Sequence, residues 1–94
     1  MINGSVNDFL DGVYNLQELI HVYHGKKYFL QGYGNSQRGE GYTLEMQLWE
    51  PEEKMLWSCV KQDPLDCREE YLNTRLYDGK TFWEAEKEIE WVDF

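Results

Sequence analysis

The sequence predicts an α+β domain in which helices cover one face of an antiparallel sheet. Two stretches, 19–33 and 42–61, are rich in strand-forming residues on either side of a turn signal, which is typical of β-hairpins. The segment from 81 to 94 places apolar residues at helical spacing behind a capping motif. We therefore expect a four-stranded antiparallel sheet made from two β-hairpins, with two C-terminal helices on one face and a short N-terminal helix.

The N-terminal helix is predicted by a capping pattern, Ser-x-x-Asp, at Ser5 and Asp8. Apolar residues follow at helical spacing, at Phe9, Leu10, Val13 and Leu16. Gly12 lies inside this segment and destabilises a helix by about 1 kcal/mol relative to alanine. We therefore expect this helix to be short.

The first predicted hairpin, 19–33, turns at His24 and Gly25. An X-Gly pair suits a two-residue type I′ turn, and histidine is among the few non-glycine residues that tolerate the positive φ required there. In this register one face carries Leu19, His21, Tyr23, Tyr28 and Leu30, and the opposite face carries Ile20, Val22 and Phe29. Both faces are apolar, which is unusual for a small antiparallel sheet with one side in water.

The second predicted hairpin, 42–61, has the most regular alternation in the chain and turns back around Pro51 and Glu52. This turn pairs Leu44 with Cys59, Met46 with Trp57 and Leu48 with Met55 on one face, and Trp49 with Lys54 on the other. The apolar pairs all lie on the same face. We therefore expect that face to contact the helices.

The first C-terminal helix is predicted to begin at Asp63, which can cap it, with Pro64 at the first helical position. Residues at helical spacing follow, at Leu65, Arg68, Glu69 and Leu72. The helix is expected to end at 73–74, before the chain crosses to a turn at Asp78 and Gly79.

The turn at Asp78 and Gly79 has two interpretations. It either closes a small hairpin between the segments beside it or leads directly into a helix. We favour the second, because Thr81 and Glu84 form a capping box in which each side chain accepts from the backbone N–H of the other residue. The helix that follows would place Phe82, Ala85, Ile89 and Val92 against the sheet.

Two short motifs, one at the first turn and one before the last helix, carry a resemblance to known proteins. Their residues are Tyr23, Gly25, Lys26, Lys27 and Tyr28, and then Asp78, Gly79, Lys80 and Glu84. With the order of the elements, they resemble a loose group of small, acidic, uncharacterised proteins from Gram-positive bacteria and their mobile elements. The resemblance covers most of the chain and implies a shared fold. It implies no activity and no catalytic residue, because none is assigned to the group.

Length and composition indicate one folded domain, residues 1–94. Apolar residues make up 41% of the chain and aromatic residues 16%, enough to form a core. We expect a cytoplasmic protein that does not bind membranes, because the sequence has no apolar run long enough for a membrane span and no signal peptide. The formal net charge of −9 would repel the phosphates of nucleic acid, so we expect no direct binding of DNA or RNA.

No arrangement of reactive residues predicts an active site. A zinc site would need four converging ligands, but His21 and His24 are three residues apart at a turn, and the two cysteines are eight apart. We expect His21 to be a half-buried core residue and His24 a turn residue. Cys59 should be a buried, unreactive thiol, and Cys67 should be free or half-exposed. The glycine-rich segment 34–41 lacks the ending of a phosphate-binding loop. We therefore expect a protein that is not an enzyme and needs no metal or cofactor.

Two surfaces predict a protein-interaction module. The first is the hairpin face with Ile20, Val22 and Phe29, which would stay uncovered if the helices occupy the other face. The second is an acidic row, made of Glu84, Glu86, Glu88 and Glu90, together with an exposed tryptophan, either Trp83 or Trp91. The simplest partner is a second copy, bound through the hairpin face as a homodimer. The alternative is an inhibitor from a mobile element, whose acidic face imitates nucleic acid and binds a basic host protein.

Overall fold

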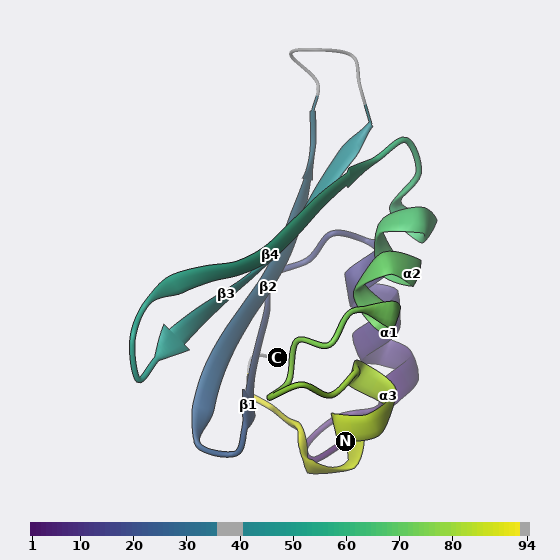
Figure 1. The fold of residues 1–94 in the computed structure, drawn as a ribbon. Helices are drawn as coiled ribbons and strands as arrows, with labels where there is room; N and C mark the ends of the chain where they lie inside the picture. Colours follow the sequence, from purple (N-terminus) through teal and green to yellow (C-terminus); the bar gives the residue numbers. More distant parts are fainter. Residues whose placement is uncertain (36–40, 93–94) are drawn as a thin grey trace.

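The computed structural model describes residues 1–35 and 41–92, which form a sheet with helices on one side (Figure 1). The helices are α1 (Val6–Tyr14), α2 (Pro64–Asn73) and the short α3 (Phe82–Ala85), which continues into a 3₁₀ turn, η2 (Glu86–Glu88). The strands are β1 (Leu19–Tyr23), β2 (Lys26–Gly34), β3 (Tyr42–Glu50), β4 (Lys54–Lys61) and β5 (Glu90–Trp91).

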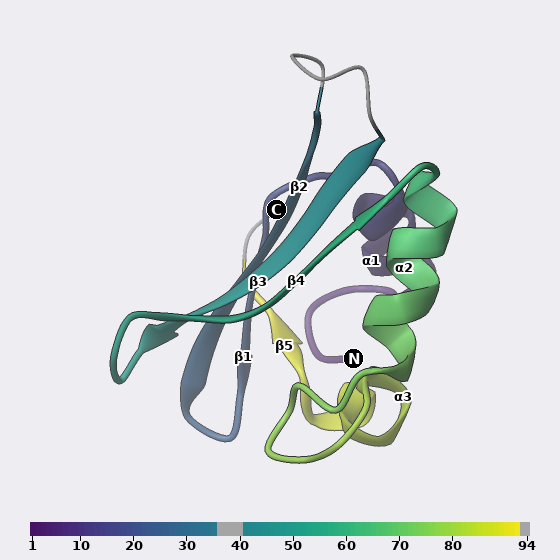
Figure 2. The ribbon, with the colours of Figure 1, turned by 45° about the horizontal axis from the view of Figure 1, so that its top comes forward.

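The strands form one antiparallel sheet in the order β4-β3-β2-β1-β5. All three α-helices lie on the same face of this sheet, and no helix of the described residues covers the opposite face (Figures 1 and 2). The expected α+β class and the antiparallel sheet are therefore confirmed. The expected number of four strands is wrong, because the residues after α3 add a fifth strand beside β1.

The C-terminal helix is much shorter than the sequence predicts. Its capping box is present: the Thr81 hydroxyl accepts from the Glu84 N–H, and the Glu84 carboxylate accepts from the Thr81 N–H at 2.9 Å. The helix nevertheless ends at Ala85, and the backbone is extended again at Ile89. The expected second long C-terminal helix is therefore one turn of α-helix, one 3₁₀ turn and a short strand.

Two physical causes end this helix early. A longer helix would place Glu84 beside Glu88, and like charges four residues apart destabilise a helix. The edge of β1 instead offers backbone groups that need partners, and the Val92 N–H donates to the Ile20 carbonyl at 3.0 Å. Val92 consequently lies beside the sheet, 41% exposed, and not in the core.

The turn before α3 combines both interpretations of Asp78 and Gly79. Both residues have positive φ, 54° and 84°, and the backbones of Tyr77 and Lys80 exchange two hydrogen bonds of 3.0 Å. This geometry is that of a tight two-residue turn. It closes a single isolated bridge, and Thr81 caps α3 directly after it.

The first hairpin has the predicted register. His24 and Gly25 adopt φ of 50° and 77°, and Tyr23 lies opposite Lys26 across the turn. The inner face is buried under the helices at Leu19, His21, Tyr23, Tyr28 and Leu30. The alternation of this hairpin therefore decides which side of the sheet the helices cover.

The second hairpin follows the predicted register over its first half. Leu44 lies opposite Cys59, and Met46 lies opposite Trp57. Between Met46 and Gln47 the register shifts at a β-bulge, where the two strands contribute unequal numbers of residues. Alternation in the sequence does not predict such a bulge.

Beyond this bulge the expected pairs are wrong. Met55 lies opposite Gln47 instead of Leu48, and Lys54 lies opposite Leu48 instead of Trp49. The shift places Met55 on the side of the sheet without helices, and its side chain is 53% exposed.

The two longer helices begin at their predicted caps. The Ser5 hydroxyl accepts from the Asp8 N–H at 3.0 Å, and the Asp63 carboxylate accepts from a backbone N–H in the first turn of α2 at 2.9 Å. Gly12 allows α1 to approach the sheet, because an added Cβ would lie only 3.0 Å from the Leu19 side chain. The glycine that weakens this helix therefore also permits its close packing.

The buried face of α2 differs from the one that its sequence spacing indicates. Cys67, Tyr71 and Leu72 are buried, whereas Leu65 is exposed. Cys67 and Tyr71 lie one turn apart on the same side of the helix, and that side contacts the sheet. The expectation that Cys67 is half-exposed is corrected: it is a fully buried free thiol.

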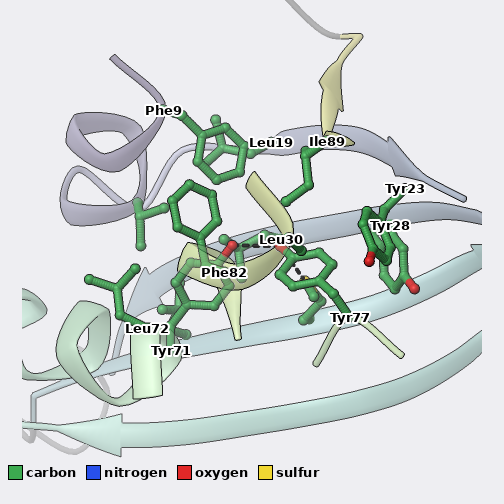
Figure 3. Close-up of a cluster of buried hydrophobic side chains, with 14 of the residues drawn as sticks. Phe9, Leu19, Tyr23, Tyr28, Leu30, Tyr71, Leu72, Tyr77, Phe82 and Ile89 are labelled. Atoms are coloured by element: carbon green, nitrogen blue, oxygen red, sulfur yellow. Dashed lines mark hydrogen bonds between the residues drawn. The ribbon is translucent and has the colours of Figure 1, made fainter. Parts of the chain in front are cut away.

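The core lies between the helices and the sheet and is rich in aromatic rings (Figure 3). Phe82 of α3 stacks on Phe9 of α1, with ring centroids 5.6 Å apart. The predicted contact between the sheet and the C-terminal segment is confirmed for Leu44, Met46, Leu48 and Cys59 with Phe82, Ala85 and Ile89, all of which lie in one buried cluster. The rings of α1 and α3 therefore fill the space above the centre of the sheet.

Replacing Thr81 by alanine should lower the free energy of unfolding by about 1 kcal/mol, because the Glu84 N–H loses its side-chain acceptor. Urea denaturation followed by tryptophan fluorescence measures this change. Thr81→Ser is the matched control, since it keeps the hydroxyl and should remain close to the wild type. Equal stability of Thr81→Ala and the wild type would show that this cap does not stabilise the fold.

Candidate functional site

The face of the sheet without helices, called the open face below, is the candidate functional site. Side chains alternate along a strand, so the neighbours of the buried Leu19, His21 and Tyr23 point to this face. The strand pairing places on it Ile20, Val22, Lys27, Phe29, Gln31, Tyr33, Thr43, Glu45, Gln47, Trp49, Glu50, Met55, Ser58, Val60 and Glu90, with Ile2 and Val92 beside β5.

Exposed apolar side chains are concentrated on the open face. Among the described residues, eight large apolar side chains are exposed, and five of them belong to this face: Ile2, Tyr33, Met55, Val60 and Val92. Ile20, Val22 and Trp49 are half-buried between them. A solvated antiparallel sheet face is usually polar, so this composition needs an explanation beyond folding of the chain.

One residue of the predicted surface is covered by the chain itself. The Trp49 ring stacks on the Phe29 ring, with centroids 4.5 Å apart, and the Trp49 indole N–H donates to Gln47 at 3.2 Å. Phe29 is therefore only 7% exposed, which corrects the expectation that it stays uncovered. Ile20 and Val22 are half-buried, and Trp49 takes the place of Phe29 at the surface.

The open face carries little net charge. Its charged side chains are Lys27, Glu45, Glu50 and Glu90. Glu50 forms an ion pair with Lys27 at 3.2 Å, and Glu45 accepts from the Gln31 amide at 2.8 Å. Glu90 accepts from the Asn3 amide at 2.8 Å. Each carboxylate of the face therefore has a local hydrogen-bond or ion-pair partner.

The predicted acidic row is dispersed in the structure. Glu84 binds Arg75 at 2.8 Å, Glu86 binds the amino group of Met1 at 3.0 Å, and Glu88 lies 3.2 Å from His24. The Thr81 N–H, together with Arg75, lowers the pKa of Glu84. Since the helix ends at Ala85, these carboxylates and Glu90 face different neighbours and do not form one row.

Trp91 also departs from its predicted place. It lies opposite His21 on the helix-covered side, and its ring contacts the Phe9 ring edge-on, with centroids 5.4 Å apart. Trp91 is half-buried and extends the core, whereas the other candidate, Trp83, is exposed on α3. The expected combination of an acidic row with Trp91 is therefore not assembled.

His21 is part of a buried chain of hydrogen bonds. The Leu19 carbonyl lies 3.0 Å from Nδ1, so Nδ1 carries the proton and donates. Nε2 then accepts from the Tyr77 hydroxyl at 2.8 Å, and the Tyr77 oxygen accepts from the Tyr71 hydroxyl at 2.5 Å. All three side chains are fully buried, and burial lowers the pKa of His21 to about 4. His21 is therefore a neutral structural residue and not half-buried as expected.

The other reactive side chains are also buried or separate. Burial raises the pKa of the Cys59 thiol to about 12, which leaves it protonated at neutral pH. Over residues 1–35 and 41–92, no three side chains of His, Cys, Asp or Glu lie together in a way that could hold a metal ion. His24 lies on the surface turn, away from the buried cysteines. Most of the glycine-rich segment 34–41 lies outside the described residues.

Sequence reasoning found only part of the open face. Tyr33 and Val60 follow from simple alternation along β2 and β4, so their position could have been predicted. Trp49 likewise lies on this face by the alternation of β3, as expected. Met55 reaches the face through a register shift, and Val92 lies on it beside the unexpected fifth strand. The local sequence carries no clear signal for these last two positions.

Comparison of the chain with protein-family models, with curated proteins and with solved structures gives no match. Among the helices of the described residues, none has the length and apolar character needed to cross a membrane.

The buried state of His21 predicts a loss of stability in mild acid. Its pKa is about 4 in the folded protein and 6.5 in the unfolded chain, so folding favours the neutral form. The contribution of neutral His21 to the free energy of unfolding is complete above pH 6.5 and is lost as the pH falls toward 4. Between pH 7 and pH 5 the free energy of unfolding should fall by about 2 kcal/mol. Urea denaturation at a series of pH values measures this loss. The loss should persist in His24→Gln and disappear in His21→Gln, and an unchanged profile in His21→Gln would contradict it.

Replacing Tyr77 by phenylalanine should lower the free energy of unfolding by about 1–3 kcal/mol. The ring is kept, but Nε2 of His21 and the Tyr71 hydroxyl lose their buried partner. Tyr33→Phe removes the same atom from an exposed tyrosine of the open face and should have almost no effect. Thermal denaturation of both variants makes the comparison, and equal stability of the two would contradict the structural role of the buried chain.

Proposed function

We propose that this protein is a non-enzymatic protein-interaction module that binds another protein through its open face. The observation that carries the proposal is the concentration of exposed apolar side chains there, at Ile2, Tyr33, Met55, Val60 and Val92. Exposed apolar side chains gathered on one face of a folded domain often mark a binding surface. Each square ångström of apolar surface removed from water contributes roughly 25 cal/mol, from which the entropy cost of association is subtracted.

The open face is suited to binding because the core of the domain is complete without it. The helices already bury the inner face of the sheet, where Leu30, Leu44 and Met46 have no exposed surface. Val60 and Met55 lie outside that core, and folding of the chain leaves both side chains largely exposed to water. Apolar side chains of the open face that contact another protein would lose exposure to water and thereby stabilise the complex.

The state of the reactive side chains supports a role without catalysis. Both ring nitrogens of His21 are hydrogen-bonded inside the core. The Cys59 thiol is buried and protonated at neutral pH. A nucleophile and a base that act on a substrate have to reach it, and these two groups are held away from solvent.

The alternative of an acidic inhibitor that imitates nucleic acid has weaker support. Such an inhibitor presents carboxylates in a regular arrangement to a basic groove. Here Glu84, Glu86 and Glu88 are each bound to a different local partner. The net charge of −9 agrees with this alternative, but no arrangement of the described residues favours it over the open face.

Photo-crosslinking tests the proposed surface directly. The photoreactive amino acid p-benzoylphenylalanine replaces Val92 on the open face or, as the matched control, Leu65 on α2; the two side chains are 41% and 42% exposed. Irradiation of the cells that produce the protein should give a covalent adduct from position 92 and none from position 65. Mass spectrometry identifies the partner. Adducts from both positions alike, or from neither, would contradict the proposal.

A further inference from the structure

We infer that the occupant of the open face is a second copy of this chain, bound as a symmetric dimer in which the two open faces pack on each other. The inference rests on the proposed function, because it identifies the partner of that same surface. Three features of the described residues carry it: the charge of the face, the order of side chains across β2, β1 and β5, and the area available.

The distribution of charge selects the open face for self-association. Two chains of net charge −9 repel each other, and the repulsion acts over a screening length of about 8 Å at physiological salt. On the open face the carboxylates of Glu45 and Glu90 are hydrogen-bonded to neutral amides, and Glu50 is paired with Lys27. With one lysine and three glutamates the face carries a net charge of −2 out of the −9 of the chain, so two identical acidic chains can approach here with limited repulsion.

The order of side chains across three strands makes the face complementary to itself. Val22 lies opposite Lys27 on one side and opposite Glu90 on the other, so a cation, an apolar side chain and a carboxylate form one row. A two-fold axis along β1 exchanges the ends of this row. Lys27 of each copy then faces Glu90 of the second copy, and Val22 packs on its own counterpart, as an interface between identical surfaces requires.

The neighbouring row behaves in the same way. Ile20 lies opposite Phe29 on β2, and on its other side its carbonyl accepts from Val92 at 3.0 Å. The same axis stacks Ile20 on its counterpart and brings Val92 of one copy to the Phe29–Trp49 pair of the other. Exposed Val92 would thus cover the aromatic pair, and sheets packed face to face in this way lie about 10 Å apart.

The area of contact predicts a weak dimer. The overlap extends from β3 to the segment at Ile2, roughly 24 Å across at the usual strand spacing, and roughly 17 Å along the strands. It covers Ile2 and Val92 and leaves Met55 and Val60 of β4 outside the contact. This is roughly 400 Å² of flat area per copy, about half the usual share of a specific interface and in the range of weak, transient contacts. A dissociation constant on the order of micromolar is therefore expected.

Sedimentation equilibrium over a range of concentrations tests for the dimer. Self-association should appear at 0.15 M salt and strengthen at 0.5 M, because salt screens the repulsion between two acidic chains but leaves apolar contact intact. A chain that remains monomeric up to millimolar concentration at both salt concentrations would overturn the inference. Weakening at high salt would also overturn it, since ionic contacts would then dominate.

Charge exchange between Lys27 and Glu90 tests the arrangement. Lys27→Glu and Glu90→Lys alone should each weaken the dimer by about tenfold, because like charges then face each other across the axis. The double variant Lys27→Glu with Glu90→Lys should recover to within about threefold of the wild type. Glu90→Lys also lowers the net negative charge, so a tighter dimer in that variant would contradict the row and indicate that only overall repulsion matters.

The crosslinking experiment separates failure of this inference from failure of the proposed function. An adduct from position 92 with the mass of two chains supports both. An adduct with a different protein, together with a monomer in sedimentation, leaves the binding surface in place and overturns the second copy as its occupant. No adduct and no dimer would overturn both.

Discussion

The hydrogen bond between Tyr77 and His21 is the contact on which the rest of the arrangement depends. It joins the turn before α3 to β1, and the Tyr71 hydroxyl extends it to α2. Elements far apart in the sequence are thereby held on the same side of the sheet, and Figure 3 shows Tyr71 and Tyr77 of this chain of hydrogen bonds in the core. A buried polar chain of this kind stabilises only when every member is satisfied, so it specifies one position for α2 and for the C-terminal segment.

Placement of all helices on one face has a direct consequence for the other face. The core is completed on the inner side, and the outer side keeps apolar residues such as Ile20, Val22 and Val60 without a covering element. The C-terminal segment contributes to both sides. Its Phe82 and Ile89 are buried in the core, whereas Val92 extends the open face beside Ile20. Folding and the proposed binding surface therefore depend on the same short segment.

The chain has a net charge of −9, but many of its carboxylates are bound to neighbouring groups. Carboxylates of α3 and η2 bind Arg75, His24 and the amino group of Met1, and those of the open face bind neighbouring amides or Lys27. Exposed pairs of this kind contribute little to stability, typically less than about 1 kcal/mol each. On the open face their main effect is to give each carboxylate a local hydrogen-bond or ion-pair partner.

The sequence by itself determined the features that depend on neighbouring residues. The caps at Ser5, Asp63 and Thr81, and the tight turn at His24, require only a few adjacent side chains and backbone groups, so local patterns predicted them correctly. Alternation in the first hairpin likewise predicted which side chains are buried and which lie on the open face.

Only the tertiary structure decided the remaining features, because they depend on groups distant in the sequence. The residues after Ala85 have helical spacing, but the unpaired edge of β1 offers them hydrogen bonds that a sequence window does not contain. The bulge that moves Met55 to the open face arises from the pairing of β3 with β4. Local patterns therefore set the two faces of the sheet, and long-range pairing set the composition of the face left open.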